Sequence, residues 1–188
     1  MPWPGDVCFS IWEEAYASGL LVFPPHGWVL EIGGAESDWT APLKEERPDL
    51  TVLTLDWRID PRPLADACIR GDVLTFPFAA QSFDAVVGIS SIEHIGLGHY
   101  EYDPLDVDGD RHCMSRVASW LKPGGWFYGD VPYDPAGYHV YGTEYRVYDD
   151  AALASRLIVP GLVEQRRWVR RLVQEPAQYV ALFARKVS

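Results

Sequence analysis

Three acidic residues stand where apolar runs of the chain end, and the first is followed by paired glycines. The segment Glu31-Ile32-Gly33-Gly34 closes the first run, and Asp56 and Asp72 close two later ones. Glycine lets a backbone turn tightly beside a ligand, and a parallel sheet brings the carboxyl ends of its strands to one edge. The three segments together predict a nucleotide site at that edge.

The type of each residue suggests what it would bind. An acid at the end of the second strand, Asp56, suits the two hydroxyls of a ribose, because a carboxylate accepts two hydrogen bonds. Asp72, after the third strand, can accept the amino group of an adenine. Ser90 ends a fourth run, and 130–133 ends a fifth. An acidic rim of this kind favours a cationic ligand over a polyphosphate.

The remaining pattern supplies the elements that must position these residues. Apolar spacing predicts helices over 6–18, 111–121 and from 149 to about 157, and a short helix capped by Ser37 or Asp38 that ends before Pro48. The predicted strands are 28–32, 51–56, a brief segment before Asp72, 83–90, 126–131, 163–171 and 178–187. The segment near 63–68 is predicted to be a loop or short helix, and 132–148 to be a long segment that contains several tyrosines and glycines.

Alternating strands and helices indicate an α/β protein with a doubly wound, mostly parallel seven-stranded sheet and helices on both faces. The last two strands lie close together in sequence, so we expect an antiparallel hairpin at the sheet edge. The length of 188 residues predicts one domain over 1–188. Within it, 1–24 is an N-terminal helical segment, and 95–110 and 132–150 are loops on the acceptor side.

Composition limits the partners. The net charge of -11, with 16 basic and 27 acidic residues, argues against a nucleic-acid partner. A basic cluster at 166–171 is more simply a solvated strand face. No apolar run approaches the roughly 18 residues of a membrane helix. The three cysteines form no CxxC pair, so we expect reduced thiols in a cytoplasmic protein, without a zinc site.

Five segments, in this order, resemble the class I S-adenosylmethionine-dependent methyltransferases. They are Val29-Leu30-Glu31-Ile32-Gly33-Gly34, Leu55-Asp56, Gly71-Asp72-Val73, Phe83-Asp84-Ala85-Val86-Val87 and Leu121-Lys122-Pro123-Gly124-Gly125. The resemblance covers roughly 25–135. It implies a Rossmann-like fold, S-adenosylmethionine as cofactor and methyl transfer as the activity.

The resemblance also implies roles for single residues. Glu31 would bind near the methionine amino group through water or loop amides, and Gly33 and Gly34 would let the loop approach the methionine and ribose. Asp56 would hold the ribose hydroxyls. Asp72 would hold adenine N6, with the Val73 amide near N1, and residues from Ser90 to Ile92 would line the methionine portion.

The glycine loop departs from the family pattern. Ala35 and Ser37 stand where the family usually has glycine. Ala35 fits if its φ is negative, but it narrows the approach to the cofactor. The alternative is a degenerate Rossmann-like domain that has lost cofactor binding.

Three histidines are candidates for a catalytic base. His94 follows the fourth strand and can deprotonate a hydroxyl near neutral pH, and His99 and His139 are further candidates. In the alternative, Glu93-His94 caps a helix or packs under the cofactor. The tyrosine-rich segment after the fifth strand either walls an acceptor pocket, acts as a lid, or packs on the sheet.

An acidic run over 103–110 resembles half a calcium loop, but it lacks the distal glutamate at the right spacing. Our prediction is therefore a loop that ends in a helix N-cap, and no metal site; the alternative is a divalent metal near the substrate that holds a diol.

The predicted function is methyl transfer from S-adenosylmethionine to a small-molecule or saccharide-like acceptor, at oxygen because hydroxyls suit a histidine base. A homodimer or a partner subunit stays open. The alternative is a non-catalytic cofactor-binding or partner subunit with this fold. A nicotinamide-dependent oxidoreductase is disfavoured, because the segment 33–38 lacks the Gly-x-Gly-x-x-Gly spacing and its acids would repel a pyrophosphate.

Overall fold

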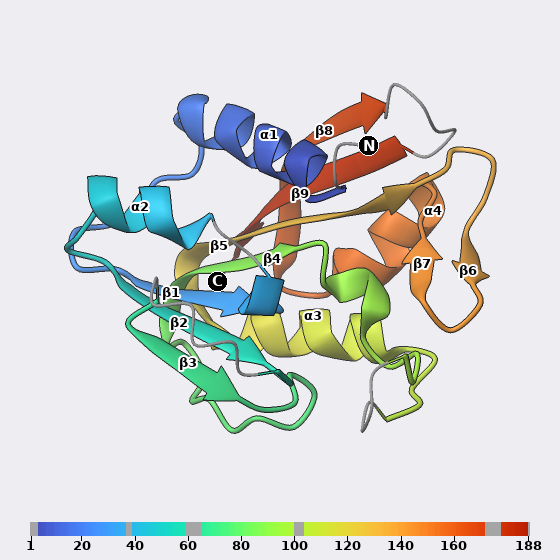
Figure 1. Cartoon of the computed structure of the whole chain (residues 1–188), viewed down its shortest axis with the longest axis horizontal. Coiled ribbons are helices and arrows are strands. Elements are labelled where there is room, and N and C mark those ends of the chain that lie inside the picture. The colour runs from blue at the N-terminus through green and yellow to red at the C-terminus, as the bar shows by residue number, and fades with distance from the viewer. Residues whose placement is uncertain (1–3, 37–38, 59–64, 100–103, 172–177, 188) are drawn as a thin grey trace.

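The computed structural model describes residues 4–36, 39–58, 65–99, 104–171 and 178–187. Within these ranges a seven-stranded sheet has the order β3-β2-β1-β4-β5-β9-β8 (Figure 1). Its strands are β1 Trp28–Ile32, β2 Thr51–Asp56, β3 Ala67–Arg70, β4 Phe83–Ile89, β5 Leu121–Tyr133, β8 Leu162–Arg171 and β9 Gln178–Lys186. The first five pair in parallel, and β9 is antiparallel to both β5 and β8. The predicted sheet and its antiparallel edge hairpin are confirmed.

The strand order changes direction between β1 and β4. From β1 the chain moves outward to β2 and β3, and then returns to the other side of β1 with β4. Six of the seven residues of β4 are buried, as the continuous apolar run predicts for a strand covered on both faces. In such sheets the crevice at the carboxyl ends of these two strands is the usual ligand site.

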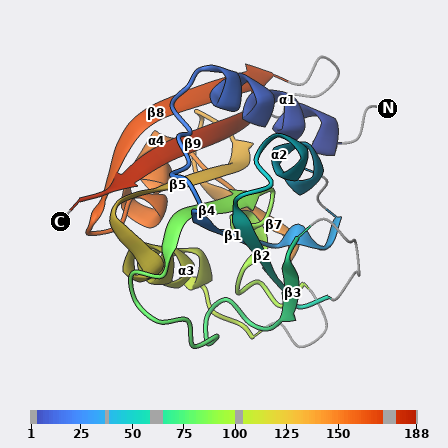
Figure 2. The same cartoon turned by 90° about the vertical axis from the view of Figure 1, so that its left-hand side faces the viewer.

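Helices cover both faces of the sheet (Figure 2). On one face lie α1 Pro4–Ala17 and α2 Thr40–Glu46, with Trp12, Trp39 and Leu43 among the buried side chains. On the other face lie α3 Gly109–Trp120, α4 Asp150–Ala152 and the single-turn π-helix η3 Leu153–Leu157. No helix in the described ranges is long and apolar enough to span a membrane.

Helix boundaries follow the sequence signals in part. Asp149 caps α4, because its side chain accepts a hydrogen bond from the Ala152 amide at 2.7 Å. Trp39 occupies the N-cap position of α2, whereas the predicted caps Ser37 and Asp38 lie outside the described residues. Two 3₁₀ turns, η1 Gly34–Glu36 and η2 Ile92–His94, follow β1 and β4.

Two segments contain strands whose positions the sequence analysis did not give. Within 132–148 lies a hairpin of β6 His139–Tyr141 and β7 Tyr145–Val147. All three residues of β6 are exposed. A strand with no buried face needs no alternation of apolar and polar residues, so the sequence carried no strand signal there. The segment near 63–68 ends in a strand, because β3 begins at Ala67; residues 59–64 lie outside the described part.

A buried arginine fastens this hairpin to the loops beside the sheet edge. The Arg146 side chain is inaccessible to solvent, and it donates to the backbone carbonyls of Ile95 at 2.7 Å and Asp106 at 3.3 Å. Asp110 accepts from the Tyr148 hydroxyl at 2.8 Å and from Arg156 at 2.7 Å. The base of the tyrosine-rich segment therefore packs against the sheet and is held in place.

Candidate active site

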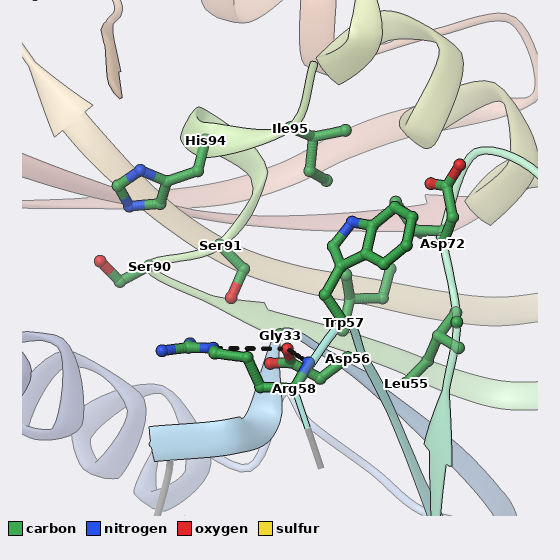
Figure 3. Close-up of a pocket in the computed structure, with 13 residues that line it drawn as sticks. Gly33, Leu55, Asp56, Trp57, Arg58, Asp72, Ser90, Ser91, His94 and Ile95 are labelled. Carbon is green, nitrogen blue, oxygen red and sulfur yellow. Dashed lines mark hydrogen bonds and ion pairs between the residues drawn. The ribbon is translucent and has the colours of Figure 1, made fainter. Parts of the chain in front are cut away.

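A cleft opens at the carboxyl ends of the parallel strands (Figure 3). Its lining residues come from the ends of β1, β2 and β4, from the turn after β3 and from η2. They are Ile32, Gly33, Leu55, Asp56, Trp57, Arg58, Gly71, Asp72, Val73, Ser90, Ser91, His94 and Ile95. The structure thus brings together six of the predicted site residues: Gly33, Asp56, Asp72, Val73, Ser90 and His94.

Gly33 makes the turn at the floor of the cleft. Its φ is 76°, and its amide donates to the Leu55 carbonyl at 2.9 Å. A Cβ on Gly33 would lie 2.2 Å from the Ser91 hydroxyl oxygen, so neither the conformation nor the space admits a side chain. Ala35, which replaces a family glycine, is not among the described residues with a positive φ. The condition for accommodating its side chain is therefore met.

The Asp56 carboxylate is held by the two backbone segments around it. One oxygen, Oδ2, accepts the Ala35 amide at 3.0 Å, and Oδ1 accepts the Arg58 amide at 2.8 Å. The Arg58 guanidinium lies beside it, with Nε 3.6 Å from Oδ1. Each oxygen keeps a second lone pair, and the side chain is 9% exposed. The carboxylate is thus fixed in orientation at the cleft wall.

Asp72 lies on the opposite side of the cleft. Its Oδ1 accepts the Leu74 amide at 2.7 Å, which forms a turn directly after the strand. The half-buried indole of Trp57 projects into the space between Asp72 and Ile95, the residue that follows η2 (Figure 3). This part of the cleft has an aromatic ring and a carboxylate, the groups that suit a purine with an exocyclic amine.

Two predicted cofactor residues lie beneath the cleft. Glu31 is 2% exposed, and its carboxylate accepts the Trp39 indole N–H at 2.6 Å and the Thr54 hydroxyl at 2.6 Å. A Cβ on Gly34 would lie 2.2 Å from Glu31 Oε2, so Gly34 lets the loop pass over this carboxylate. Within the described part of the chain, neither belongs to the lining set. Both support the loop that carries Gly33.

The ring nitrogens of His94 have different surroundings. Nδ1 lies 2.5 Å from the carbonyl oxygen of Glu144 at the tip of the β6–β7 hairpin. Because a carbonyl only accepts, Nδ1 carries the proton and Nε2 bears the lone pair of the neutral ring. Nε2 lies 3.8 Å from Glu93 Oε1, a carboxylate that would stabilise a protonated imidazole. Nε2 is therefore the basic atom of this side chain.

The other two histidines lie farther out. The His99 ring stacks near the His94 ring with centroids 6.1 Å apart, and it is exposed. His139 is exposed on β6, with Nδ1 3.1 Å from the Gly137 carbonyl oxygen. Among the described residues, the cleft lining includes His94 and neither His99 nor His139.

Among the polar and aromatic lining residues, the sequence analysis did not name Trp57 and Arg58. Trp57 and Arg58 follow Asp56 directly, and their position at a strand end was the available signal. It placed 130–133 at a strand end and Glu93 beside His94, but it did not predict that Glu93 and Asp130 are buried. Glu93 and Asp130 are 1% and 0% exposed, and burial raises the pKa of each carboxyl to about 7. Their burial depends on packing between distant segments, which no local pattern reveals.

The acidic run before α3 has structural partners. Asp106 Oδ2 lies 2.6 Å from His112 Nδ1, and the buried Asp110 pairs with Arg156. Across the described residues, no group of three or more histidine, cysteine or acidic side chains could hold a metal ion. Asp103 of the calcium-like pattern lies outside the described part.

Many solved structures with this architecture are S-adenosylmethionine-dependent methyltransferases, so the resemblance to the class I methyltransferase fold is confirmed. The Burkholderia thailandensis 1,6-didemethyltoxoflavin-N1-methyltransferase, with bound 1,6-didemethyltoxoflavin and S-adenosylhomocysteine, is 18% identical, with a TM-score of 0.71 over 93% of this chain and 76% of that one. The N-methyltransferase NodS from Bradyrhizobium japonicum is 16% identical, with a TM-score of 0.66 over 97% and 96%.

The same fold also occurs in a protein named for a different activity. The cyclase SpnF is 12% identical, with a TM-score of 0.70 over 93% of this chain and 79% of that one. At such identities the likeness establishes the fold, and the activity must be argued from the site. No curated protein matches the sequence.

One family matches the sequence itself. It is described as "Caenorhabditis protein of unknown function, DUF268", and the match covers residues 73–169. This range contains β4, η2, α3 and β5, and so includes Ser90, Glu93 and His94. Because the match spans just over half of the chain, the protein belongs to this family, on a class I methyltransferase fold.

Proposed function

We propose that the chain binds S-adenosylmethionine in the cleft and transfers its methyl group to a hydroxyl of a small-molecule or saccharide-like acceptor. One observation carries the proposal: Gly33, Asp56, Asp72 and Ser90, which end or follow four parallel strands, converge on one cleft. A backbone turn without a side chain, a fixed carboxylate and an aromatic ring are the parts that a nucleoside needs.

The residues present fit this cofactor. Asp56 would accept the ribose hydroxyls with the lone pairs that Ala35 and Arg58 leave unused. Trp57 would stack on the adenine, and Asp72 would accept its amino group. The turn at Gly33, which lies close to Ser91, would contact the methionine portion. Glu31 would act through the loop above it, because its oxygens already accept from Trp39 and Thr54.

The bound cofactor would supply a methyl group activated by a sulfonium. The protein then has to hold the acceptor oxygen in line with that group and remove its proton. His94 Nε2 would take the proton, and Glu93 would stabilise the resulting imidazolium from 3.8 Å. The Glu144 carbonyl would keep the ring in the tautomer that leaves Nε2 basic. His99 and His139 would then be part of the acceptor side and would not act as bases.

The acceptor would enter between η2 and the β6–β7 hairpin. There the His94 and Tyr145 rings lie edge to face with centroids 6.3 Å apart, and the Tyr145 and Tyr141 rings stack at 5.3 Å. Tyr141 is 58% exposed. A row of rings that reaches the surface suits the apolar face of a sugar or another ring-shaped molecule. The chain's net charge of -11 disfavours an anionic acceptor.

Replacing Asp56 with Asn tests the cofactor site. We expect the affinity for S-adenosylhomocysteine to fall by about tenfold to a hundredfold, since hydrogen bonds to a charged group contribute about 1.5–3 kcal/mol. Asp84→Asn is the matched control. Asp84 also accepts a backbone amide, that of Trp28 at 2.8 Å, but it is the second residue of β4 and lies at the end of the strand opposite to the cleft. Equal affinities in both variants would refute the placement of the site.

Methyl transfer needs its own measurement, because a protein of this fold can bear another activity. Formation of S-adenosylhomocysteine would be followed with a panel of hydroxylated ring compounds. We expect turnover with at least one, and its loss in His94→Asn with cofactor affinity retained. Tight cofactor binding without turnover on any of the panel would favour a non-catalytic role.

A further inference from the structure

Ser90 has an unfavourable backbone conformation at the floor of the cleft. Its φ is 45°, which places it among the few non-glycine residues of the described ranges with a positive φ. A left-handed backbone is unfavourable for a residue with a side chain, and it persists only where surrounding contacts enforce it. The residue lies between the end of β4 and η2, directly before the segment that carries His94.

Two buried acids make those contacts. The Ser90 amide donates to Asp130 Oδ1 at 2.9 Å, and the Ser90 hydroxyl donates to Glu93 Oε1 at 3.0 Å. Asp130 comes from the neighbouring strand β5, and Glu93 lies in η2. The backbone and the side chain of Ser90 are thus each bound to a different carboxylate.

These carboxylates occupy a poorly solvated site. Their second oxygens, Glu93 Oε2 and Asp130 Oδ2, are buried without a hydrogen-bond partner among the described residues. Buried carboxylates are costly unless they are paired or neutral. A simple packing role would be met at lower cost by apolar side chains, as buried ion pairs show.

Other titratable groups surround the two acids. Cys8 of α1 lowers the pKa of Asp130 against the larger effect of burial. The pKa values of Tyr128 in β5 and Tyr179 in β9 are raised by burial and, to a smaller extent, by the nearby acids. Arg146 of β7 lowers the pKa of Glu93 against the larger effect of burial, and His94 lies 3.8 Å from Glu93.

We propose that Glu93 and Asp130 are positioning residues that together hold Ser90 in its left-handed conformation, and so place Ser90 and His94 against the bound methyl donor. This inference rests on the proposed function for its consequence in the cleft. We call the two hydrogen bonds from Ser90 to Asp130 and Glu93 the Ser90 clamp. The clamp is present in the protein without cofactor, so it can be measured separately.

Hydrogen exchange followed by mass spectrometry tests the clamp. In Asp130→Ala the Ser90 amide loses its acceptor, so we expect exchange in the segment 89–95 to speed up at least tenfold. Asp130→Asn keeps an oxygen in the same place and should restore most of the protection. Asp84→Asn, at the other end of β4, should leave the segment unchanged. Unchanged exchange in a folded Asp130→Ala protein would overturn the proposal.

A second comparison covers the case in which Asp130→Ala does not fold. Ser90→Gly and Ser90→Ala both remove the hydroxyl, but glycine alone tolerates the left-handed backbone. We expect the glycine variant to melt about 3 °C higher than the alanine variant, from the usual relation for a chain of this size. Equal melting temperatures would contradict an enforced positive φ at this position.

The link to the cleft is read from the affinity for S-adenosylhomocysteine. We expect a loss of about tenfold in Asp130→Ala, recovery in Asp130→Asn, and little loss when Asp130→Ala is combined with Ser90→Gly, which removes the need for the clamp. An undiminished effect of Asp130→Ala in the Ser90→Gly background would overturn the positioning role. If the unaltered protein binds no S-adenosylhomocysteine, the proposed function fails, while the exchange and melting results still decide the clamp.

Discussion

Replacing Asp130 with Asn should flatten the dependence of folding stability on pH between about pH 4 and pH 7. Burial, with a contribution from the nearby charge of Glu93, raises the pKa of Asp130 from 3.8 to about 7 in the folded protein. Over this interval the folded protein retains a proton that the unfolded chain has released. The free energy of unfolding therefore falls as pH rises, and the loss is complete above the folded pKa.

The size of the effect follows from the same values. Each pH unit in that interval changes the free energy of unfolding by about 1.4 kcal/mol for each such group. The rise in the pKa of Asp130 from 3.8 to about 7 therefore corresponds to a loss of roughly 4 kcal/mol in the free energy of unfolding across this interval, from Asp130 alone. Glu93, whose pKa is also raised to about 7, adds a comparable slope. Asn removes the Asp130 part and leaves that of Glu93, so the slope should fall by about half.

Urea unfolding followed by tryptophan fluorescence, at half-unit steps from pH 4.5 to 8, measures this slope. The control is Asp84→Asn, the same chemical change on a carboxylate that is 17% exposed and paired with Lys122 at 2.7 Å. Its slope should match that of the unaltered protein. An Asp130→Asn variant that keeps the full slope would refute the reasoning that this carboxyl is neutral in the folded protein.

Three further substitutions probe the cleft and its support. Gly33→Ala should lower the free energy of unfolding by about 1–3 kcal/mol in thermal unfolding and weaken S-adenosylhomocysteine binding at least tenfold, because Gly33 has a positive φ and a Cβ there would collide with Ser91. The control is Gly124→Ala, at a φ of 79° with nothing within 4 Å of a Cβ, which should lower stability without weakening binding. Arg146→Met should cost about 2–4 kcal/mol in urea unfolding, since it leaves buried carbonyls without donors. Trp57→Ala should weaken binding of the same ligand by about 1–3 kcal/mol in calorimetry, the usual contribution of base stacking, with little change in the melting temperature.

Much of the fold could be predicted because the strands are local patterns. The runs at 28–32 and 51–56 are apolar, and β1 and β2 have these bounds. Because parallel strands end at the same edge of a sheet, the acids near the ends of these strands could be placed together without knowledge of any contact. The β6–β7 hairpin escaped prediction because its stability comes from Arg146 and Tyr148, which bind segments about 40 to 50 residues away.

The site could be predicted only as far as the strand ends reach. Gly33, Asp56 and Asp72 end or directly follow strands, and the cleft forms there. Glu31 has the same kind of position, but its side chain points under the loop to Trp39 and Thr54. Successive residues of a strand face opposite sides, so the end of a strand does not settle which side chain reaches the cleft.

The buried acids were the least predictable part. Glu93 and Asp130 are acidic residues, and acidic residues are expected at the surface because most of them are exposed in folded proteins. Their burial follows from the packing of α1, η2, β5 and β9 around the end of β4, a set of elements drawn from the whole chain.

Calorimetric titration of the purified chain with S-adenosylmethionine and S-adenosylhomocysteine, with NAD as control, tests the central claim most directly. The account predicts micromolar binding of the first two at one site per chain, and none of NAD. Binding of NAD, or of none of the three, would contradict the assignment of this cleft to S-adenosylmethionine.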